Sequence, residues 1–356
     1  MIAVLADDLT GAAEIAGIGR RYGLRTELAL DIIPDTQPDL LVVTADTRSL
    51  SEEEAIHRTG ELCRKLLTLN PEWVYKKIDS VLRGHVRAEL EVQRAVFGQQ
   101  KVWIVPAHPL MERGVKNGLY VIGGRLISET AFAHDPEFPV KDARVTHLLN
   151  LPEAVSVRVG EPLPAFAGWF IAEATSPEEI AGWAMRCEGL LAGAAPFFEA
   201  CLRQRAGAPV IPECPVPGKR RLYICGSTFR SEKTRRAAQT DGNVIVIPRE
   251  NDQKPVLPER DTLILVAPTE READPNAVKY RMATYAAELY TDFVPEELLI
   301  EGGATAAAVL RQLNFRHLTD VNELAPGVVR CRLPDNRHVI LKPGSYPWAP
   351  GLWVAD

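Results

Sequence analysis

Several patterns that would assign a function directly are missing from this sequence. Its six cysteines are widely spaced and form no C-x-x-C pair, which argues against a zinc ribbon or a thiol redox motif. Neither a Walker A motif nor a spaced G-x-G-x-x-G occurs, which argues against a P-loop or a dinucleotide-binding Rossmann domain. No apolar run reaches the roughly 18 residues that a membrane helix requires. The sequence therefore points away from these classes.

The sequence also lacks an excess of positive charge. The chain of 356 residues has 41 Lys and Arg against 47 Asp and Glu, a net charge of −6, so no bulk attraction to nucleic acid or anionic membrane is expected. The N-terminus lacks a basic segment, and Asp7 and Asp8 interrupt its first apolar run, which argues against a signal peptide. Scattered cysteines fit a reducing compartment. We expect a cytoplasmic protein without nucleic-acid or membrane partners, and a homo-oligomer remains open.

Short apolar runs alternate with helical periodicity in the first part of the chain. Strands are predicted at residues 2–6, 40–45, 73–78 and 101–106, and helices at 12–21, 51–69 and 86–97. This alternation predicts βαβ units around a mostly parallel sheet. A hairpin is expected near residues 121–125, and helical patterns are expected from residue 177 to about residue 205.

A proline-rich segment separates this part from a second series of alternating elements. Residues 206–219 (AGAPVIPECPVPGK) contain four prolines without periodicity, which is typical of a domain linker. Beyond it, strands are predicted at 222–225, 244–247, 263–266 and 298–300, and helices at 232–239 and 275–290. The sequence thus predicts an α/β fold of two domains, residues 1–212 and 213–356, each a mostly parallel sheet flanked by helices.

The first predicted strand ends on two adjacent carboxylates, Asp7 and Asp8, followed by Thr10 and Gly11. Ligands of open parallel sheets bind beyond the carboxyl ends of the strands. Thr10 is expected to cap the next helix. One or both carboxylates could then accept hydrogen bonds from hydroxyl groups, hold a metal or take a proton. The alternative is that one Asp is a cap and the other is solvated.

The segment YKKIDSVLRGH offers a denser set of polar groups at a strand end. Lys76 and Lys77 precede Asp79 and Ser80, and Arg83 follows before the next helix. Because strand side chains alternate, one lysine must point away from the site. An arginine can bind a carboxylate through two parallel hydrogen bonds. The segment is therefore typical of a site that reads an anion and hydroxyl groups.

Two further strand ends add charge. TADTRS contributes Asp46 and Arg48, most simply interpreted as a surface ion pair. VPAHPLMERG contributes Arg113. Its His108 could be an acid or base, but a lone histidine near prolines is more simply structural. Carboxylates and guanidinium groups at successive strand ends suit a small polyhydroxylated acid as ligand.

The second part of the chain carries glycine-rich turns after its strands. LLIEGGATAAAVL places Gly302 and Gly303 before a helix of small residues, whose free N–H groups suit phosphate. YICGSTFRSEKT repeats this arrangement, and HVILKPGSYPW places Lys342 and Gly344 after a last strand. These loops are each weak signals, but together they indicate phosphate binding.

The order of these motifs along the chain resembles that of the four-carbon acid sugar kinases, which include threonate and erythronate kinases. The motifs are ADDLTGA, KIDSVLRG, VPAHP…ERG with ISETAFAHDPEFPV, CGS and EGGAT. The resemblance implies an N-terminal acid-sugar-binding domain and a C-terminal ATP-binding domain with the active-site cleft between them. It further implies transfer of the γ-phosphoryl group of ATP, with Mg²⁺, to the terminal hydroxyl of a sugar acid. Threonate and erythronate are equal candidates.

The resemblance also assigns roles by position. The implied substrate contacts are Asp8, Arg48, Lys77, Ile78, Asp79 and Ser80, with Arg83 and Arg113 as additions. Asp7 is also expected to bind substrate, because of its place at the strand end. Among these, Asp8, Asp79 and Arg83 are the expected catalytic residues, and Asp8 is the first candidate for orienting and deprotonating the attacking hydroxyl. Arg83 and Arg48 are expected to hold the substrate carboxylate, and Lys77 is expected to offset developing charge. The implied ATP contacts are Ser227, Ser231, Gly302, Gly303, Ala304, Thr305 and Gly344, and Lys342 is added because it precedes Gly344 after the last predicted strand. No metal ligand is predicted.

Two positions depart from the family pattern. Ser227 and Ser231 stand four residues apart, where the family usually has G-S-x-S-x-x-T. Pro343 stands where the family has serine and removes a backbone N–H. The alternative function is therefore a catalytically silent sugar-acid-binding protein that has lost ATP use. A haloacid-dehalogenase-type phosphatase is disfavoured because D-x-D-x-T is absent after the first strand.

Overall fold

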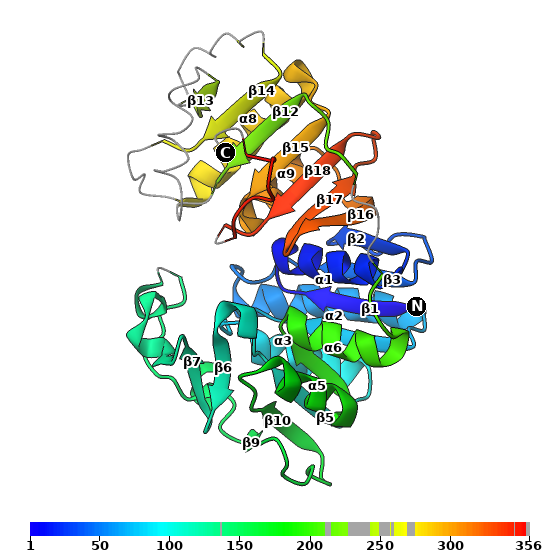
Figure 1. Ribbon diagram of the computed structural model, residues 1–356, viewed down its shortest axis with the longest axis vertical. Helices are drawn as coiled ribbons and strands as arrows, with labels where there is room; N and C mark the ends of the chain where they lie inside the picture. The colour runs from blue at the N-terminus through cyan, green and yellow to red at the C-terminus, as the bar shows by residue number, and fades with distance from the viewer. Residues whose placement is uncertain are drawn as a thin grey trace.

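The protein has two α/β halves, and in Figure 1 the N-terminal half lies below the C-terminal half. The computed structural model describes residues 1–135, 137–210, 215–226, 243–248, 257, 260–268, 275–344 and 346–353. Ser227 and Ser231 of the predicted ATP site, and the helix predicted at 232–239, lie outside the described residues.

The N-terminal half is built on a parallel sheet in the order β2-β3-β1-β4-β11-β5-β10-β9. Its strands are β1 (Ile2–Ala6), β2 (Thr26–Leu30), β3 (Leu40–Thr44), β4 (Trp73–Lys77), β5 (Lys101–Val105), β9 (Val155–Val157), β10 (Gly168–Ala172) and β11 (Leu190–Gly193). Its helices are α1 (Leu9–Arg21), α2 (Glu52–Thr68), α3 (Val86–Val96), α4 (Val145–Leu148), α5 (Pro177–Arg186) and α6 (Ala195–Ala206).

A small antiparallel sheet projects from this half (Figure 1). It consists of β6 (Arg113–Lys116), β7 (Leu119–Ile122) and β8 (Arg125–Leu126). Short 3-10 turns flank it at η1 (Pro109–Met111), η2 (Ile127–Glu129) and η3 (Ala131–His134). The hairpin predicted near residues 121–125 is the turn between β7 and β8.

The C-terminal half contains a second sheet in the order β13-β14-β12-β15-β18-β17-β16. Its strands are β12 (Arg221–Cys225), β13 (Val244–Val246), β14 (Thr262–Val266), β15 (Glu297–Glu301), β16 (His317–Ala325), β17 (Val328–Arg332) and β18 (His338–Lys342), and its described helices are α8 (Pro275–Phe293) and α9 (Gly303–Gln312). The first five strands in this order run parallel, whereas β17 and β16 are antiparallel to their neighbours. Because β16 also pairs antiparallel with β2, the two sheets are continuous.

Local sequence explains most of these elements. The strand β3 is buried along its whole length, as its unbroken run LLVVT predicts for a parallel sheet covered on both faces. Helix α2 begins at a capping box in which Ser51 and Glu54 each accept from the other's backbone N–H. Three glutamates in its first turn complement the positive end of the helix dipole.

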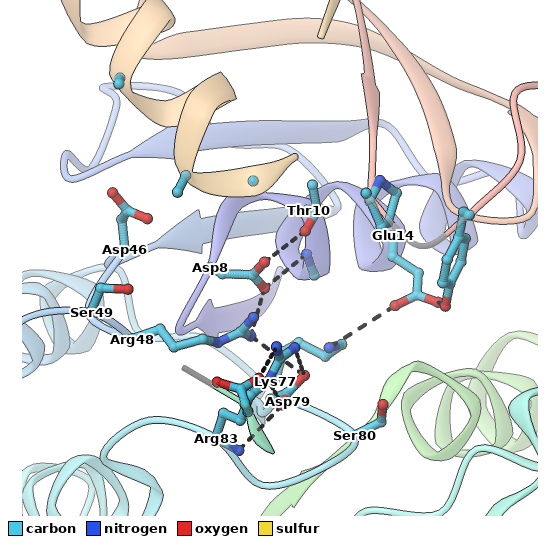
Figure 2. Close-up of a pocket in the computed structure, with 18 of the residues that line it drawn as sticks. Asp8, Thr10, Glu14, Asp46, Arg48, Ser49, Lys77, Asp79, Ser80 and Arg83 are labelled. Carbon is cyan, nitrogen blue, oxygen red and sulfur yellow. Dashed lines mark hydrogen bonds and ion pairs between the residues drawn. The ribbon is translucent and has the colours of Figure 1, made fainter. Parts of the chain in front are cut away.

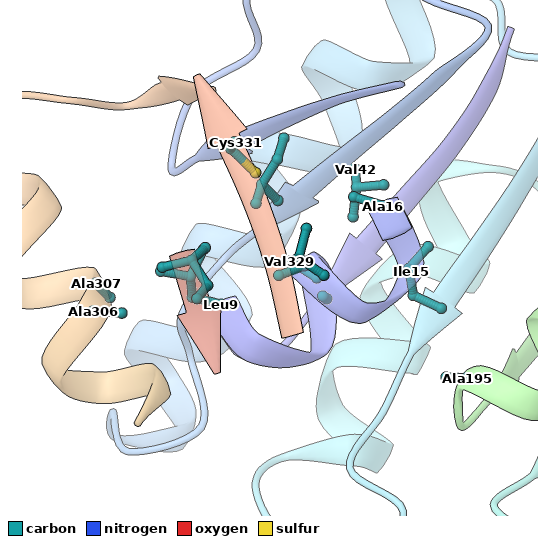
Figure 3. Close-up of a cluster of buried hydrophobic side chains, with 14 of the residues drawn as sticks. Leu9, Ile15, Ala16, Val42, Ala195, Ala306, Ala307, Val329 and Cys331 are labelled. Carbon is teal, nitrogen blue, oxygen red and sulfur yellow. The ribbon is translucent and has the colours of Figure 1, made fainter. Parts of the chain in front are cut away.

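Helix α1 joins the cores of the two halves. Almost all of its residues are buried, and Leu9 and Ile15 belong to the same hydrophobic cluster as Ala306 of α9 and Val329 of β17 (Figure 3). Burying apolar surface against both halves fixes α1, and with it the end of β1, relative to the C-terminal half.

The two-domain α/β prediction is confirmed, but one part of the element prediction is wrong. Helical structure does not continue from residue 177 to 205, because β11 lies between α5 and α6 and pairs with both β4 and β5. Periodicity cannot separate a strand as short as LLAG from a helix. The predicted boundary at residues 212 and 213 lies outside the described residues and stays a prediction. None of the described helices is long and apolar enough to cross a membrane.

Candidate active site

One cavity of about 1260 Å³ lies where the two halves meet. The N-terminal half lines it with the segments that follow β1, β3, β4 and β5, and the C-terminal half lines it with α8, α9 and the loop after β18. These segments follow the carboxyl ends of parallel strands, as expected for an α/β ligand site. Figure 2 shows Asp8, Arg48, Asp79 and Arg83 joined by ion pairs within this group of lining residues.

Asp8 stands at the centre of this cavity. It is the N-cap of α1, where its Oδ1 accepts from the Gly11 backbone N–H at 3.0 Å and its Oδ2 accepts from the Thr10 hydroxyl at 2.6 Å. The expectation that Thr10 is the cap is therefore wrong. Burial alone would raise the pKa of Asp8, but Arg48, Lys77 and the Thr10 hydrogen bond together lower it. The carboxylate is ionised at neutral pH.

Asp7 lies behind Asp8 and does not line the cavity. Its Oδ2 accepts from Arg48 Nε at 2.7 Å, and its backbone oxygen accepts from the Thr47 N–H at 2.9 Å. Burial raises the pKa of this carboxyl group. Asp7 therefore orients Arg48, and its side chain is not placed to meet a ligand in the cavity.

Arg48 does not form the surface pair with Asp46 that the sequence suggested. Its Nη2 lies 3.0 Å from Asp8 Oδ1, while Asp46 pairs across the cavity with Arg311 of α9 at 2.5 Å. Asp46 and Arg48 are only two residues apart in the sequence, but their partners lie in different parts of the fold, and Asp46 has a positive φ of 47°. Arg48 thus belongs to the centre of the site.

Asp79 and Arg83 form a second ion pair at the cavity wall. Arg83 Nε donates to Asp79 Oδ2 at 2.7 Å and Nη2 donates to Oδ1 at 3.2 Å. Burial opposes the charge of Asp79, but Arg48 and Arg83 hold its pKa well below the usual range. Both groups are therefore charged, and each neutralises much of the other.

The alternation of strand β4 divides its two lysines, as expected. Lys77 lines the cavity and lies 4.0 Å from Glu14, whereas Lys76 pairs with buried Glu89 on the other side of the sheet. Ile78 is fully buried in a hydrophobic cluster and does not line the cavity. Its predicted contact with substrate is thus not made by its side chain in this arrangement.

Arg113 differs from the other arginines of the site. Its Nη1 donates to the Ser80 hydroxyl at 2.6 Å, its Nε has no hydrogen-bond partner, and no carboxylate lies within ion-pair distance among the described residues. Its guanidinium also stacks near the Phe132 ring, at 5.5 Å from the centroid. A half-buried cation without an acidic partner among the described residues is a natural receptor for an incoming carboxylate.

The N-terminus of α9 faces this acidic and basic cluster. Gly302 is the N-cap with φ 97°, and no side chain caps the helix. Gly303 and Ala304 line the cavity, and a Cβ on Gly303 would lie only 3.0 Å from both Asp8 Oδ2 and the Thr10 hydroxyl. Glycine therefore lets the positive end of α9 approach Asp8 closely.

Two other predicted ATP residues are placed differently. Thr305 is buried against Gly226 and does not line the cavity. Lys342 is 1% exposed and donates to the backbone oxygens of Pro343 and Tyr346, at 2.9 and 2.7 Å. Its ammonium group therefore holds the terminal loop in place and is not directed into the cavity, which Gly344 does line.

Sequence reasoning missed several lining residues. Glu14 and Tyr346 form a group with His108 on one side of the cavity, so His108, interpreted above as structural, also lines the cavity. Glu14 is a charged residue one turn after Thr10 on a helix whose other residues between Thr10 and Arg20 are apolar, and that pattern could have revealed it. No local signal links Asp46 with Arg311 or Glu14 with Tyr346, because each pair joins distant parts of the chain.

Comparisons with known proteins agree with this division of the chain. Residues 2–160 match a family model described as a sugar-binding N-terminal domain, and residues 230–346 match one described as a nucleotide-binding C-terminal domain. The chain is 26% identical to a D-threonate kinase of Bordetella bronchiseptica, over 92% of this chain and 88% of that protein. It is 30% identical to a D-erythronate kinase of Heliobacterium modesticaldum, over 44% of this chain and 37% of that protein.

The fold also has close relatives among solved structures. A Salmonella typhimurium protein described as a putative tRNA synthase superposes with a TM-score of 0.78 at 18% identity, covering 97% of this chain and 96% of that one. At this identity the likeness concerns the fold alone. The paired domain matches and the curated kinases nonetheless lead to one conclusion: the chain belongs to the four-carbon acid sugar kinase family.

Proposed function

We propose that this kinase transfers the γ-phosphoryl group of ATP to the terminal hydroxyl of a four-carbon sugar acid such as threonate or erythronate. The proposal rests mainly on one observation: Gly303, at the start of α9, lies close to Asp8, and both residues line the same cavity. A helix N-terminus favours phosphate, and a carboxylate favours a hydroxyl, so the two reacting groups would meet there.

The N-terminal half would hold the acid. Arg113, with no acidic partner among the described residues, is the best placed receptor for the substrate carboxylate, with Ser80 beside it. This refines the sequence-based hypothesis, which gave that role to Arg83 and Arg48, because both of those side chains are already paired with aspartates. Arg83 and Asp79 would form the wall of the acceptor site.

Asp8 would orient the attacking hydroxyl and accept its proton. The hydroxyl oxygen forms a bond to the γ-phosphorus while the bond to the bridging oxygen of ADP breaks. The lowered pKa of Asp8 makes it a weak base, which is sufficient because phosphoryl transfer depends mainly on positioning and charge neutralisation. Lys77 would offset developing negative charge.

Mg²⁺ in kinase sites neutralises phosphate charge and is commonly held by one or two carboxylates together with the phosphates. Asp8, next to α9, fits such a role. Among the described residues no group of three or more His, Cys, Asp or Glu side chains could hold a metal by itself. The ion would therefore arrive with the nucleotide.

The test is an ADP-release assay with Mg-ATP and the D and L forms of threonate and erythronate. ADP formation with one acid supports the proposal and identifies the substrate. Pro343 lines the cavity where a backbone N–H is missing, which favours the silent sugar-acid-binding alternative. No ADP release together with no thermal stabilisation by ATP would favour that alternative.

A further inference from the structure

Glu14 is a carboxylate of the cavity to which the proposed reaction gives no task. It lies on α1, one turn beyond Thr10, and its side chain is 15% exposed. Its Oε1 lies 3.5 Å from His108 Nε2 and its Oε2 lies 4.0 Å from Lys77 Nζ. Figure 2 shows the Glu14 carboxylate on the same side of the site as Lys77.

The environment of Glu14 keeps it charged. Burial by itself raises its pKa, but the hydrogen bond from His108 and the charge of Lys77 outweigh burial and lower it. An ionised carboxylate can only accept hydrogen bonds. A neighbouring group must therefore donate to it.

The C-terminal half provides such a donor. The hydroxyl of Tyr346 lies 3.4 Å from Glu14 Oε1, although the two residues are 332 positions apart. The phenol is held on two sides, because Lys342 donates to the Tyr346 backbone oxygen and the ring packs against Gly327 in the turn between β16 and β17. Burial raises the pKa of Tyr346, so its hydroxyl keeps its proton.

These contacts leave the two oxygens of Glu14 in different situations. Oε1 is engaged by Tyr346 and His108, whereas Oε2 has only Lys77, at 4.0 Å, and accepts no hydrogen bond among the residues that the structure describes. A carboxylate fixed through one oxygen and open at the other is well suited to accept from a ligand hydroxyl.

We propose that Glu14 binds a hydroxyl of the sugar acid, and that Tyr346 is a positioning residue from the nucleotide-binding half that fixes the Glu14 carboxylate. This inference rests on the proposed function. It means that the acceptor site is complete only when the loop after β18 is in place. The C-terminal half thus contributes to acid recognition as well as to nucleotide binding.

The experiment measures binding, which does not depend on turnover. Dissociation constants for D-threonate, D-erythronate and a non-hydrolysable ATP analogue are determined by calorimetry for the native protein, Tyr346→Phe, Glu14→Gln and the double variant. Tyr22→Phe is the matched control, because the Tyr22 hydroxyl also contacts a glutamate, Glu199, at 3.3 Å, but outside the cavity.

Glu14→Gln is expected to weaken binding of the acid by about tenfold or more, the usual effect of a hydrogen bond to a charged group. Tyr346→Phe is expected to weaken it by about threefold to tenfold, with nucleotide affinity and unfolding temperature nearly unchanged. Because Tyr346 acts through Glu14, the double variant should bind the acid no more weakly than Glu14→Gln alone.

Other results overturn the inference. Native acid affinity in either single variant would exclude the assigned role, and so would additive losses in the double variant. Equal losses of acid and nucleotide affinity in Tyr346→Phe would indicate a merely structural residue. If the native protein binds an acid but the assay finds no ADP release, the kinase proposal is refuted, and the dissociation constants of the variants still decide the roles of Glu14 and Tyr346. If the native protein binds neither acid, both proposals are refuted.

Discussion

Replacing Gly303 by alanine tests the junction between the two halves directly. The new Cβ would lie 3.0 Å from Asp8 Oδ2 and from the Thr10 hydroxyl, closer than ordinary van der Waals contact. Neither neighbour can yield freely, because Thr10 donates to Asp8 at 2.6 Å and Asp8 also caps α1 through Gly11. We therefore expect the start of α9 to withdraw from Asp8.

The magnitude follows from two opposing effects. Alanine is favoured over glycine in a helix by up to about 1 kcal/mol, whereas overpacking a tight site costs about 1–3 kcal/mol. Gly182→Ala in α5 is the control, because nothing lies within 4 Å of its Cβ position and only the favourable effect remains. The difference between the two variants in free energy of unfolding, measured by urea denaturation, gives the steric cost.

The same displacement should slow the reaction. A loss of about 1.4 kcal/mol of transition-state stabilisation corresponds to a tenfold change in rate, so kcat is expected to fall by roughly tenfold or more in Gly303→Ala and to stay native in Gly182→Ala. The ADP-release assay measures both. If Gly303→Ala were stabilised as much as Gly182→Ala and kept its kcat, the close approach of α9 to Asp8 would have no role in catalysis.

Three other changes probe single residues of the site. Asp8→Asn keeps a good N-cap but removes the charge, so kcat should fall about 10²-fold or more, and calorimetry should find a much smaller loss of ATP affinity; unchanged turnover would reject the proton-accepting role. Lys342→Met removes the cation paired with buried Glu301 and should destabilise the fold by about 3–5 kcal/mol in urea denaturation, whereas a phosphate ligand would instead raise KM for ATP with little loss of stability. The lowered pKa of Asp79 means that its ion pair with Arg83 stabilises the protein above the unfolded value of 3.8 and is lost as pH falls below it. The stability advantage of the native protein over Asp79→Asn should therefore be present at pH 7 and shrink toward about pH 3, and a constant advantage would contradict this pairing.

Much of the fold was readable from local patterns. The strand predicted at 40–45 and the helix predicted at 51–69 match β3 and α2 closely, because the burial of a run such as LLVVT and the capping of a helix by Ser51 act over a few residues. The strand β11 escaped prediction because four small and apolar residues carry no distinctive period. Its place in the middle of the sheet depends on pairing with β4 and β5, which are far away in sequence.

The candidate site divides in the same way. The DDLTG turn and the strand-end segment around Lys77 could be selected from sequence because parallel strands bring their carboxyl ends to one edge. The partners of each charge could not be selected. Arg48 pairs with Asp7 and Asp8 rather than with Asp46, whose partner Arg311 belongs to a helix far away in sequence.

The sequence by itself therefore determined the fold class, the family and the strand ends that carry chemistry, since each follows from short-range pattern. Tertiary structure alone decided which of those groups meet. Pairing of β16 with β2, and burial of α1 against both halves, bring α9 over Asp8 and Tyr346 to Glu14. Such contacts arise from the packing of distant elements, and hydrophobic burial has no direction that a local sequence pattern could record.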